Sequence, residues 1–186
     1  MENLLFIRHA ETDLAGRFCG HSNPPLNERG FRQIEELLDT LRSEHIDALY
    51  ASDLSRSLTT ADAIGRTFGL PSIAVPELRE IDFGEWEGLS WVEIESRDRA
   101  YARRWSEAHP NLPAPGGESF DAFQSRVLTQ VKYLLAAASQ RCTAVVTHAG
   151  VMRVVLRSLC GLDEQEAWER TKAYCGFFRY QPVRIP

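Results

Sequence analysis

The amino-acid sequence predicts an α/β fold in which a mostly parallel central sheet is covered by helices on both faces. Short apolar segments alternate along the chain with longer segments whose apolar residues recur at helical spacing. The short segments are continuously hydrophobic, which is typical of strands buried on both faces. At 186 residues the chain suits one domain, so we expect residues 1–186 to form a single unit.

The first three elements lie in the N-terminal third of the chain. Residues 4–7 are apolar and are followed by a charged residue, which indicates a buried strand. Residues 27–44 carry leucine and isoleucine at spacings of three and four, so we expect a helix with one apolar face. Residues 48–51 form a second short strand.

A second helix is expected at residues 54–68. Ser52 or Asp53 is placed to cap its N-terminus, and Gly69 follows its last residue as a helix-ending glycine. The segment 72–75 is read as a third strand because it is short, largely apolar and bounded by a proline.

The C-terminal part predicts two more helices and two more strands. Residues 119–138 place phenylalanine, valine and leucine on one helical stripe, and residues 142–147 form a β-branched, apolar strand. Residues 150–159 form a further helix, which Gly161 ends. Residues 177–180 are the last expected strand.

The middle segment does not follow this alternation of strands and helices. Residues 88–118 contain tryptophan and tyrosine and end in a stretch rich in proline and glycine. We interpret this segment as a helical insertion, or lid, that lies over the sheet edge or over a functional site.

Composition and charge exclude several classes of protein. The chain carries 21 Lys and Arg against 26 Asp and Glu, so it has no overall basic field for nucleic acid or an anionic membrane. No apolar run is long enough for a signal-peptide core or a membrane span. The four cysteines are scattered, which favours free thiols over disulfides or a zinc site. We therefore expect a cytoplasmic protein without a bound metal ion.

Side chains that can carry out chemistry follow four of the predicted strands. In chain order they are Arg8 and His9, Arg56, Glu80, and His148. Ligands in open α/β sheets bind at the carboxyl ends of the strands, so we expect these side chains to converge on one site.

Such a site suits the hydrolysis of phosphate monoesters. A neutral imidazole is a competent nucleophile, arginine binds phosphate bidentately, and a protonated carboxylic acid can donate its proton to a departing alkoxide. Phosphoryl transfer depends mainly on positioning and charge stabilisation, so cationic side chains can take the place of a metal ion. The set is sufficient for a phosphohistidine mechanism that needs no cofactor.

Each of these residues alone has a simpler interpretation. A histidine at a strand end is usually structural, an arginine in the first turn of a helix is usually a solvated charge, and an acidic loop is usually hydrated. A cation at a helix N-terminus opposes the helix dipole, but an anion bound beside it would account for its position. The joint placement of the residues is what favours a phosphate site.

Five short motifs resemble those of the histidine phosphatase superfamily, also called the phosphoglycerate mutase-like superfamily, and they occur in its order. The motifs are Arg8-His9-Ala10-Glu11-Thr12, Pro25-Leu26-Asn27-Glu28-Arg29-Gly30, Ser52-Asp53-Leu54-Ser55-Arg56 with Thr60-Ala61, Glu77-Leu78-Arg79-Glu80 with Phe83-Gly84-Glu85-Trp86-Glu87-Gly88, and Thr147-His148-Ala149-Gly150. They span nearly the whole chain. The resemblance implies a phosphoglycerate mutase-like fold with the 88–118 insertion over the active site.

The resemblance also implies a role for each matching residue. His9 would be the nucleophile that becomes phosphohistidine, and Glu80 would donate a proton to the leaving group and later act as a base for water. The phosphoryl oxygens would be held by Arg8, Arg56 and His148. Further substrate contacts are implied at Thr12, Gly20 and Ala149.

The chain departs from the family pattern in its first loop. Ala10 stands where the family usually has glycine, which is tolerable only if the backbone angles there are ordinary. Leu14-Ala15 stands where many members have an asparagine that contacts phosphate. That donor is therefore missing, or it is supplied by another residue such as His21 or Asn23.

Residues 113–127 and the compact length are most similar to the α-ribazole phosphatase branch of the family. The first candidate substrate is therefore α-ribazole 5′-phosphate, an intermediate of cobalamin nucleotide-loop assembly. Alternatives are a broad-specificity sugar-phosphate, phosphoserine or phosphoglycerate phosphatase, a phosphoglycerate mutase, and an inactive phospholigand-binding module. We expect a small phosphomonoester as partner, without nucleic acid or membrane, and a monomer or homodimer.

Overall fold

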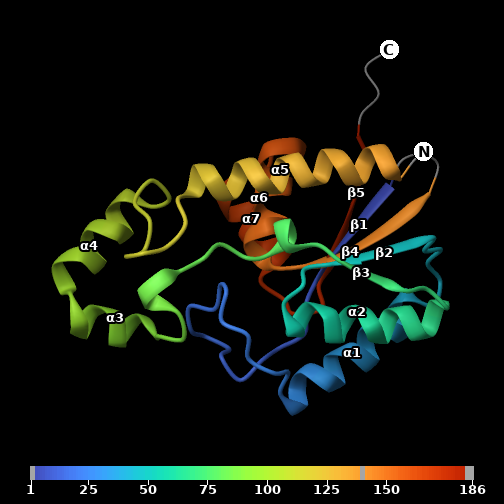
Figure 1. Cartoon of the computed structure of the whole chain (residues 1–186), viewed down its shortest axis with the longest axis horizontal. Coiled ribbons are helices and arrows are strands. Elements are labelled where there is room, and N and C mark those ends of the chain that lie inside the picture. The colour runs from blue at the N-terminus through green and yellow to red at the C-terminus, as the bar shows by residue number, and fades with distance from the viewer. Residues whose placement is uncertain (1–2, 139–140, 183–186) are drawn as a thin grey trace.

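The chain folds around a five-stranded sheet, and this confirms the predicted α/β class (Figure 1). The structure is a computed structural model that describes residues 3–138 and 141–182. Its strand order is β3-β2-β4-β1-β5, in which β5 runs antiparallel to β1 and the other described pairs are parallel. The strands are β1 (Asn3–Arg8), β2 (Ala48–Ala51), β3 (Ser72–Ala74), β4 (Cys142–Thr147) and β5 (Phe177–Tyr180).

The register between two central strands brings two distant histidines together. β1 pairs with β4 so that Arg8 lies opposite Thr147. The next residues along these two strands are His9 and His148, and the backbone N–H of His9 donates to the carbonyl of Thr147 at 2.9 Å. A slip of one residue would exchange the side chains on the two faces of β1, so burial of the strand helps to fix this pairing.

Helices cover both faces of the sheet, as the sequence predicts (Figure 1). One face packs against α1 (Glu28–Leu41) and α2 (Ser55–Phe68). The other face packs against α5 (Phe120–Ala137) and α6 (Ala149–Cys160), with α7 (Glu164–Thr171) beside α6.

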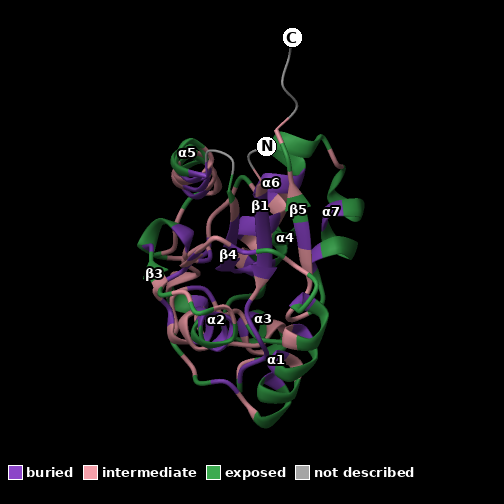
Figure 2. Cartoon of the chain, turned by 90° about the vertical axis from the view of Figure 1, so that its right-hand side faces the viewer, coloured by how far each residue is buried: buried purple, intermediate pink, exposed green. Residues whose placement is uncertain are grey.

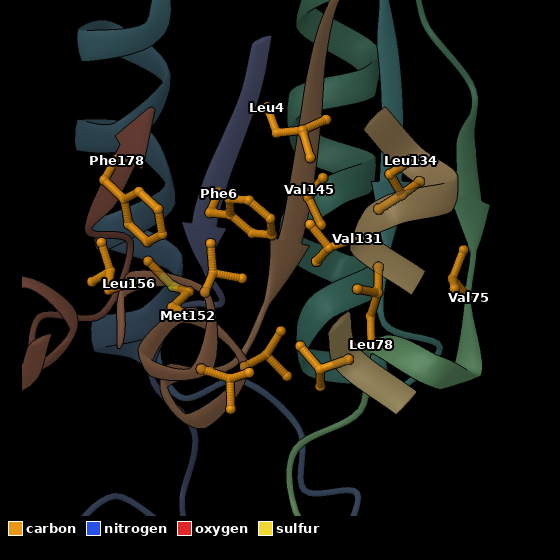
Figure 3. Packing of buried hydrophobic residues seen from close by; sticks show 14 of the residues in the cluster. Leu4, Phe6, Val75, Leu78, Val131, Leu134, Val145, Met152, Leu156 and Phe178 are labelled. Carbon is orange, nitrogen blue, oxygen red and sulfur yellow. The ribbon is translucent and has the colours of Figure 1, made fainter. Parts of the chain in front are cut away.

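The strand β1 contributes to both cores because its side chains alternate between the two faces of the sheet. Leu5 and Ile7 join the apolar residues of α1 and α2, whereas Leu4 and Phe6 join those of α5 and α6. Phe6 stacks on Phe178 of β5 with ring centroids 5.4 Å apart (Figure 3). Figure 2 shows the resulting pattern, in which the central strands are buried and the outer helix faces are exposed.

One predicted helix boundary and one predicted helix cap are wrong. The helix was expected at 27–44, but α1 ends at Leu41. Neither Ser52 nor Asp53 caps α2, whose N-cap has no side-chain acceptor. The Ser52 hydroxyl bonds His148 instead, and the Asp53 carboxylate pairs with Arg79. Both side chains are thus committed to other contacts at the carboxyl edge of the sheet.

The helix α7 is absent from the sequence prediction. Its buried residues are Ala167 and Thr171, so it lacks the apolar stripe on which a helix is usually recognised. Its start is nevertheless marked by a capping box between Asp163 and Glu166. That pattern is the signal in the sequence from which the helix could have been predicted.

The segment 88–118 is helical, as expected, and lies beyond the carboxyl ends of the central strands (Figure 1). It contains α3 (Trp91–Arg97) and α4 (Arg99–Ala108), followed by an irregular return to α5. Phe18 from the first loop packs edge-on against Trp86, which precedes the segment, and Trp105, and it stacks on Trp91. The insertion has its own small core, formed by Trp86, Ile94, Ala102 and Ala114.

Replacing Phe6 by alanine should lower the free energy of unfolding by about 3–5 kcal/mol, because the cavity would open inside a fully buried cluster. Urea denaturation followed by circular dichroism measures this change. The matched control is Tyr133→Ala, whose side chain is exposed and should change stability by no more than about 0.5 kcal/mol. Equal losses in both variants would contradict the packing described.

Candidate active site

His9 stands at the carboxyl end of β1 as a buried imidazole with one nitrogen free of a proton. Its Nδ1 lies 2.7 Å from the carbonyl of Ala10, and Nε2 lies 3.3 Å from Nε of Arg56, which can only donate. This network puts the ring proton on Nδ1 and the lone pair on Nε2. Burial, followed by the charges of Arg56 and Arg8, holds the pKa of His9 well below its usual value. The ring is therefore neutral and nucleophilic at Nε2.

Arg56 is the most unusual side chain of the site, because it is fully buried without an ionic partner. Its guanidinium donates to the carbonyls of Ser22 and Gly20, each at 2.6 Å, and of Cys19 at 3.3 Å. No carboxylate of the described residues forms an ion pair with it. A buried, unpaired charge is costly, so this geometry favours the binding of an anion.

The loop that holds Arg56 is itself held by Glu87. The Glu87 carboxylate accepts backbone N–H bonds from Gly20 at 3.1 Å, His21 at 2.7 Å and Ser22 at 2.9 Å. Burial acts to raise the pKa of Glu87, but these hydrogen bonds outweigh it and the net effect is a lowered pKa. The Gly20 N–H is therefore engaged with Glu87, while the Gly20 carbonyl accepts from Arg56. The substrate contact implied at Gly20 stays a prediction.

Arg8 is oriented by the end of α7 and by an aromatic ring. Its Nη1 donates to the carbonyls of Thr171 at 3.1 Å and Lys172 at 2.5 Å, and its guanidinium carbon lies 3.9 Å from the ring centre of Tyr174. The Nε of Arg8 is buried and has no partner among the described residues. Arg8 thus keeps an unused donor, and it forms no ion pair within the described part of the chain.

His148 is the N-cap of α6 and lies next to His9, with the two ring centres 5.0 Å apart. Its Nε2 lies 2.9 Å from the Ser52 hydroxyl and 3.4 Å from that of Ser57, while its buried Nδ1 has no partner in the described chain. Burial and then Arg56 hold its pKa well below the usual value, so the ring is neutral. A proton donated by Ser52 to Nε2 leaves Nδ1–H as an unused donor beside His9.

Glu80 faces the N-terminus of α6 from the loop that follows β3. Its carboxylate accepts N–H bonds from Gly150 at 2.8 Å and from Ile81 at 3.0 Å. A Cβ at position 150 would lie 2.0 Å from Glu80 Oε1, so a larger residue there would force the Glu80 carboxylate to shift. Arg126 secures the loop by donating to the carbonyl of Glu80 at 2.9 Å and pairing with Glu118 at 2.7 Å.

These side chains meet in a cleft of about 920 Å³ between the insertion and helices α6 and α7. Arg56 and His148 lie behind His9, within hydrogen-bond or ring-contact distance of it and out of solvent. The predicted site residues that line the cleft directly are Arg8, His9, Thr12, Glu80 and Ala149.

The departures of the first loop have structural explanations. Ala10 is fully buried and has no positive φ, so a methyl group is accommodated at this position. Asn23 accepts from the backbone N–H and hydroxyl of Ser55 at 2.7 Å and thereby serves the first turn of α2. His21 lies 3.5 Å from Asp82. Neither Asn23 nor His21 lines the cleft, so neither takes the place of the family asparagine in this conformation.

Three residues that support the site were given no role in the sequence analysis. Ser57 and Thr60 on α2 contact His148 and the backbone of Ala10, and Tyr174 stacks on Arg8. Thr60 lies in the motif around Arg56 at a spacing of four, which is one helical turn, and this spacing was the available signal. Tyr174 has no comparable signal, because it follows a helix that the sequence did not predict.

The described residues hold neither a metal cluster nor a membrane helix. No group of three or more His, Cys, Asp or Glu side chains within 3–138 and 141–182 is arranged to bind a metal ion. No helix in these ranges has both the length and the apolar character that crossing a bilayer requires.

The arrangement can carry out nucleophilic substitution at phosphorus. It combines the Nε2 lone pair of His9, the guanidinium groups of Arg8 and Arg56, an unused donor on His148 and a carboxyl group on Glu80. Guanidinium groups stabilise the charge on phosphoryl oxygens, and the carboxyl group can exchange a proton with the ester oxygen.

Comparison with known proteins agrees with this geometry. The family model described as Histidine phosphatase superfamily (branch 1) matches residues 4–182. Phosphoserine phosphatase 1 of Hydrogenobacter thermophilus is 32% identical over 170 residues, which cover 90% of this chain and 81% of that protein. The adenosylcobalamin/alpha-ribazole phosphatase of Salmonella typhimurium is 30% identical over 167 residues, covering 89% and 83%. The crystal structure of the alpha-ribazole phosphatase from Shigella flexneri matches with a TM-score of 0.87 at 26% identity, covering 98% and 91%.

Stability should fall as the pH drops below 6.5, because His9 and His148 have lowered pKa values in the folded chain and ordinary ones when unfolded. The unfolded state then binds protons that the folded state does not, which removes up to about 1.4 kcal/mol per histidine and pH unit. Urea denaturation in phosphate-free buffer between about pH 5.5 and 7 measures this slope. His148→Asn should make the slope shallower, whereas His45→Asn, at an exposed position, should not. The two variants must therefore differ in the pH dependence of their stability. An unchanged slope in His148→Asn would contradict the lowered pKa of His148.

Proposed function

This chain belongs to the histidine phosphatase superfamily, and from that premise we propose that it hydrolyses small phosphomonoesters through a phosphohistidine on His9, without a metal ion. The observation that carries the proposal is the buried Arg56, which has no ionic partner among residues 3–138 and 141–182 and donates through Nε to the nucleophilic nitrogen of His9. A phosphoryl group placed there would meet the cation and the nucleophile at the same point.

The first step transfers the phosphoryl group from the ester to the imidazole. The Nε2 lone pair of His9 attacks phosphorus while the bond from phosphorus to the ester oxygen breaks. Arg8, Arg56 and His148 stabilise the charge on the phosphoryl oxygens. Glu80, in its protonated form, gives its proton to the departing alkoxide, which leaves as an alcohol.

The second step returns the imidazole to its starting form. Glu80, now a carboxylate, accepts a proton from a water molecule as the water oxygen attacks phosphorus. The phosphorus–nitrogen bond breaks, and inorganic phosphate leaves the cleft. The hydrogen bond from Arg56 Nε occupies the lone pair of His9 Nε2. When substrate binds, Arg56 Nε donates to a phosphoryl oxygen instead, and the lone pair is free to attack.

Two phosphomonoesters are the leading substrate candidates. α-Ribazole 5′-phosphate is supported by the similarity of residues 113–127 to that branch and by relatives named for it in Salmonella typhimurium and Shigella flexneri. O-Phosphoserine is supported by the relative named phosphoserine phosphatase 1. Rates on a panel with both esters, 3-phosphoglycerate and a sugar phosphate, compared by kcat/KM, would rank them.

An inactive phospholigand-binding module is the alternative from another functional class. Such a module needs the arginines but has no use for a neutral nucleophile or for a carboxyl group at the ester oxygen. Both His9 and Glu80 line the cleft, which favours catalysis over binding alone. A mutase is less well supported, because the cleft leaves His9 in contact with open space that water can enter.

Hydrolysis of p-nitrophenyl phosphate in excess EDTA tests the proposal directly. We expect turnover to survive the chelator and to fall to background in His9→Ala, while His45→Ala, at an exposed position, keeps wild-type activity. Acid-labile, alkali-stable phosphate on the trapped enzyme would identify the phosphohistidine. Phosphate binding without turnover would instead favour the binding module, and activity abolished by EDTA would overturn the metal-free mechanism.

Glu80→Gln should discriminate between leaving groups in kcat/KM, which reports the first step and not the hydrolysis of the phosphohistidine that is common to all esters. The kcat/KM of alkyl phosphates should fall roughly 100-fold or more, because the alkoxide then departs without a proton. The kcat/KM of p-nitrophenyl phosphate should fall less than about tenfold, since nitrophenolate departs unprotonated. Glu85→Gln, an exposed acid of the same loop, is the matched control and should change neither rate. Equal losses on both esters would show that Glu80 is not the proton donor.

A further inference from the structure

Arg153 places a second cation on the wall of the cleft, beyond the residues used in the proposed reaction. It lies on α6 and lines the same cleft as Arg8 and Glu80. Burial lowers the pKa of Arg8, and the positive charge of Arg153 lowers it further. The two guanidinium groups are therefore close enough to interact. None of the steps assigned to the other residues makes use of the Arg153 guanidinium.

The Arg153 side chain is held in place but has no ionic partner. Its Nε donates to the carbonyl of Ala149 at 3.3 Å, and its guanidinium carbon lies 4.8 Å from the ring centre of Trp168. Among the residues that the structure describes, no carboxylate forms an ion pair with it. The neighbouring Arg157 differs, because it pairs with Glu164 at 3.3 Å. Arg153 is thus a positioned guanidinium whose two Nη groups have no hydrogen-bond partner in the part of the chain that the structure describes.

Arg153 lies near the atoms that follow the ester oxygen in a bound substrate. Its Nε bonds Ala149, and the next residue, Gly150, donates to the Glu80 carboxylate at 2.8 Å. Glu80 gives its proton to the ester oxygen, so the leaving group begins within about one helical turn of the Arg153 contact. An anion attached a few bonds beyond the ester oxygen would therefore approach this guanidinium.

We propose that Arg153 binds a carboxylate on the leaving group, so that the site prefers phosphomonoesters of short hydroxy acids. The inference rests on the proposed phosphatase function and deepens it. A carboxylate two carbon–carbon bonds of about 1.5 Å each beyond the phosphate-bearing carbon, as in O-phosphoserine or 3-phosphoglycerate, has the required reach. Arginine is suited to this role because its planar group binds carboxylates bidentately. α-Ribazole 5′-phosphate has no such carboxylate.

A matched pair of esters isolates the carboxylate. O-Phosphoserine and O-phosphoethanolamine share the phosphate, the two-carbon link and the ammonium group, and they differ by the carboxylate alone. The ratio of their kcat/KM values cancels differences in folding and in active-site concentration. We expect wild type to prefer O-phosphoserine by roughly tenfold or more, the scale of a charged hydrogen bond.

Arg153→Met should lower this ratio by roughly tenfold or more, since methionine retains much of the packing on Trp168 but not the charge. Arg153→Lys should restore part of it. The control Arg32→Met removes an exposed charge from α1 and should leave the ratio unchanged.

Three results would overturn the inference. They are a wild-type ratio near one, an equal loss on both esters in Arg153→Met, and a higher kcat/KM for α-ribazole 5′-phosphate that is insensitive to Arg153. In each of these cases p-nitrophenyl phosphate is still hydrolysed, so the proposed phosphatase function stands. Absence of hydrolysis of every ester, p-nitrophenyl phosphate included, would instead overturn the proposed function and the subsite together.

Discussion

The burial of the Arg56 guanidinium without a carboxylate partner is the constraint around which the site is built. Carbonyls of Cys19, Gly20 and Ser22 satisfy its donors, but no carboxylate of the described residues forms an ion pair with it. A carboxylate partner would relieve that cost but would also compete with a phosphoryl group for the same cation. Glu87 does not contact the guanidinium. It accepts hydrogen bonds from backbone N–H groups of the loop, and this holds the loop carbonyls in place around Arg56.

The same unpaired charges keep the nucleophile ready. Burial, and after it the positive charge of the nearby arginines, disfavours protonation of both imidazoles, so the pKa values of His9 and His148 are lowered. The parallel pairing of β1 with β4 brings these rings together from opposite ends of the sequence. The strand ends therefore supply the position, burial together with the arginine charges keeps the two imidazoles neutral, and the arginines supply the attraction for phosphate. A metal ion is not needed to provide positive charge at this point.

Much of the fold and of the site could be predicted, because both depend on patterns that are visible within short stretches of the sequence. Continuous apolar strands predicted the parallel sheet, and strand-end placement predicted that His9, Glu80 and His148 meet. Contacts that depend on tertiary structure could not be predicted. Ser52 was read as a helix cap because that is its usual local role, yet it bonds His148 across the sheet edge. Gly20 was expected to contact substrate, but the bond from its N–H to Glu87, which is 67 residues away in the chain, could not be predicted.

The most direct test of the account is a crystal structure of the protein with orthovanadate, which adopts the geometry of phosphorus under attack. The account predicts vanadium bonded to Nε2 of His9, with its oxygens contacting Arg8, Arg56 and His148, and the apical oxygen facing Glu80. Vanadate bound elsewhere, or a His9 that keeps its bond to Arg56 in saturating vanadate, would contradict the claim that the unpaired arginines form a phosphoryl site.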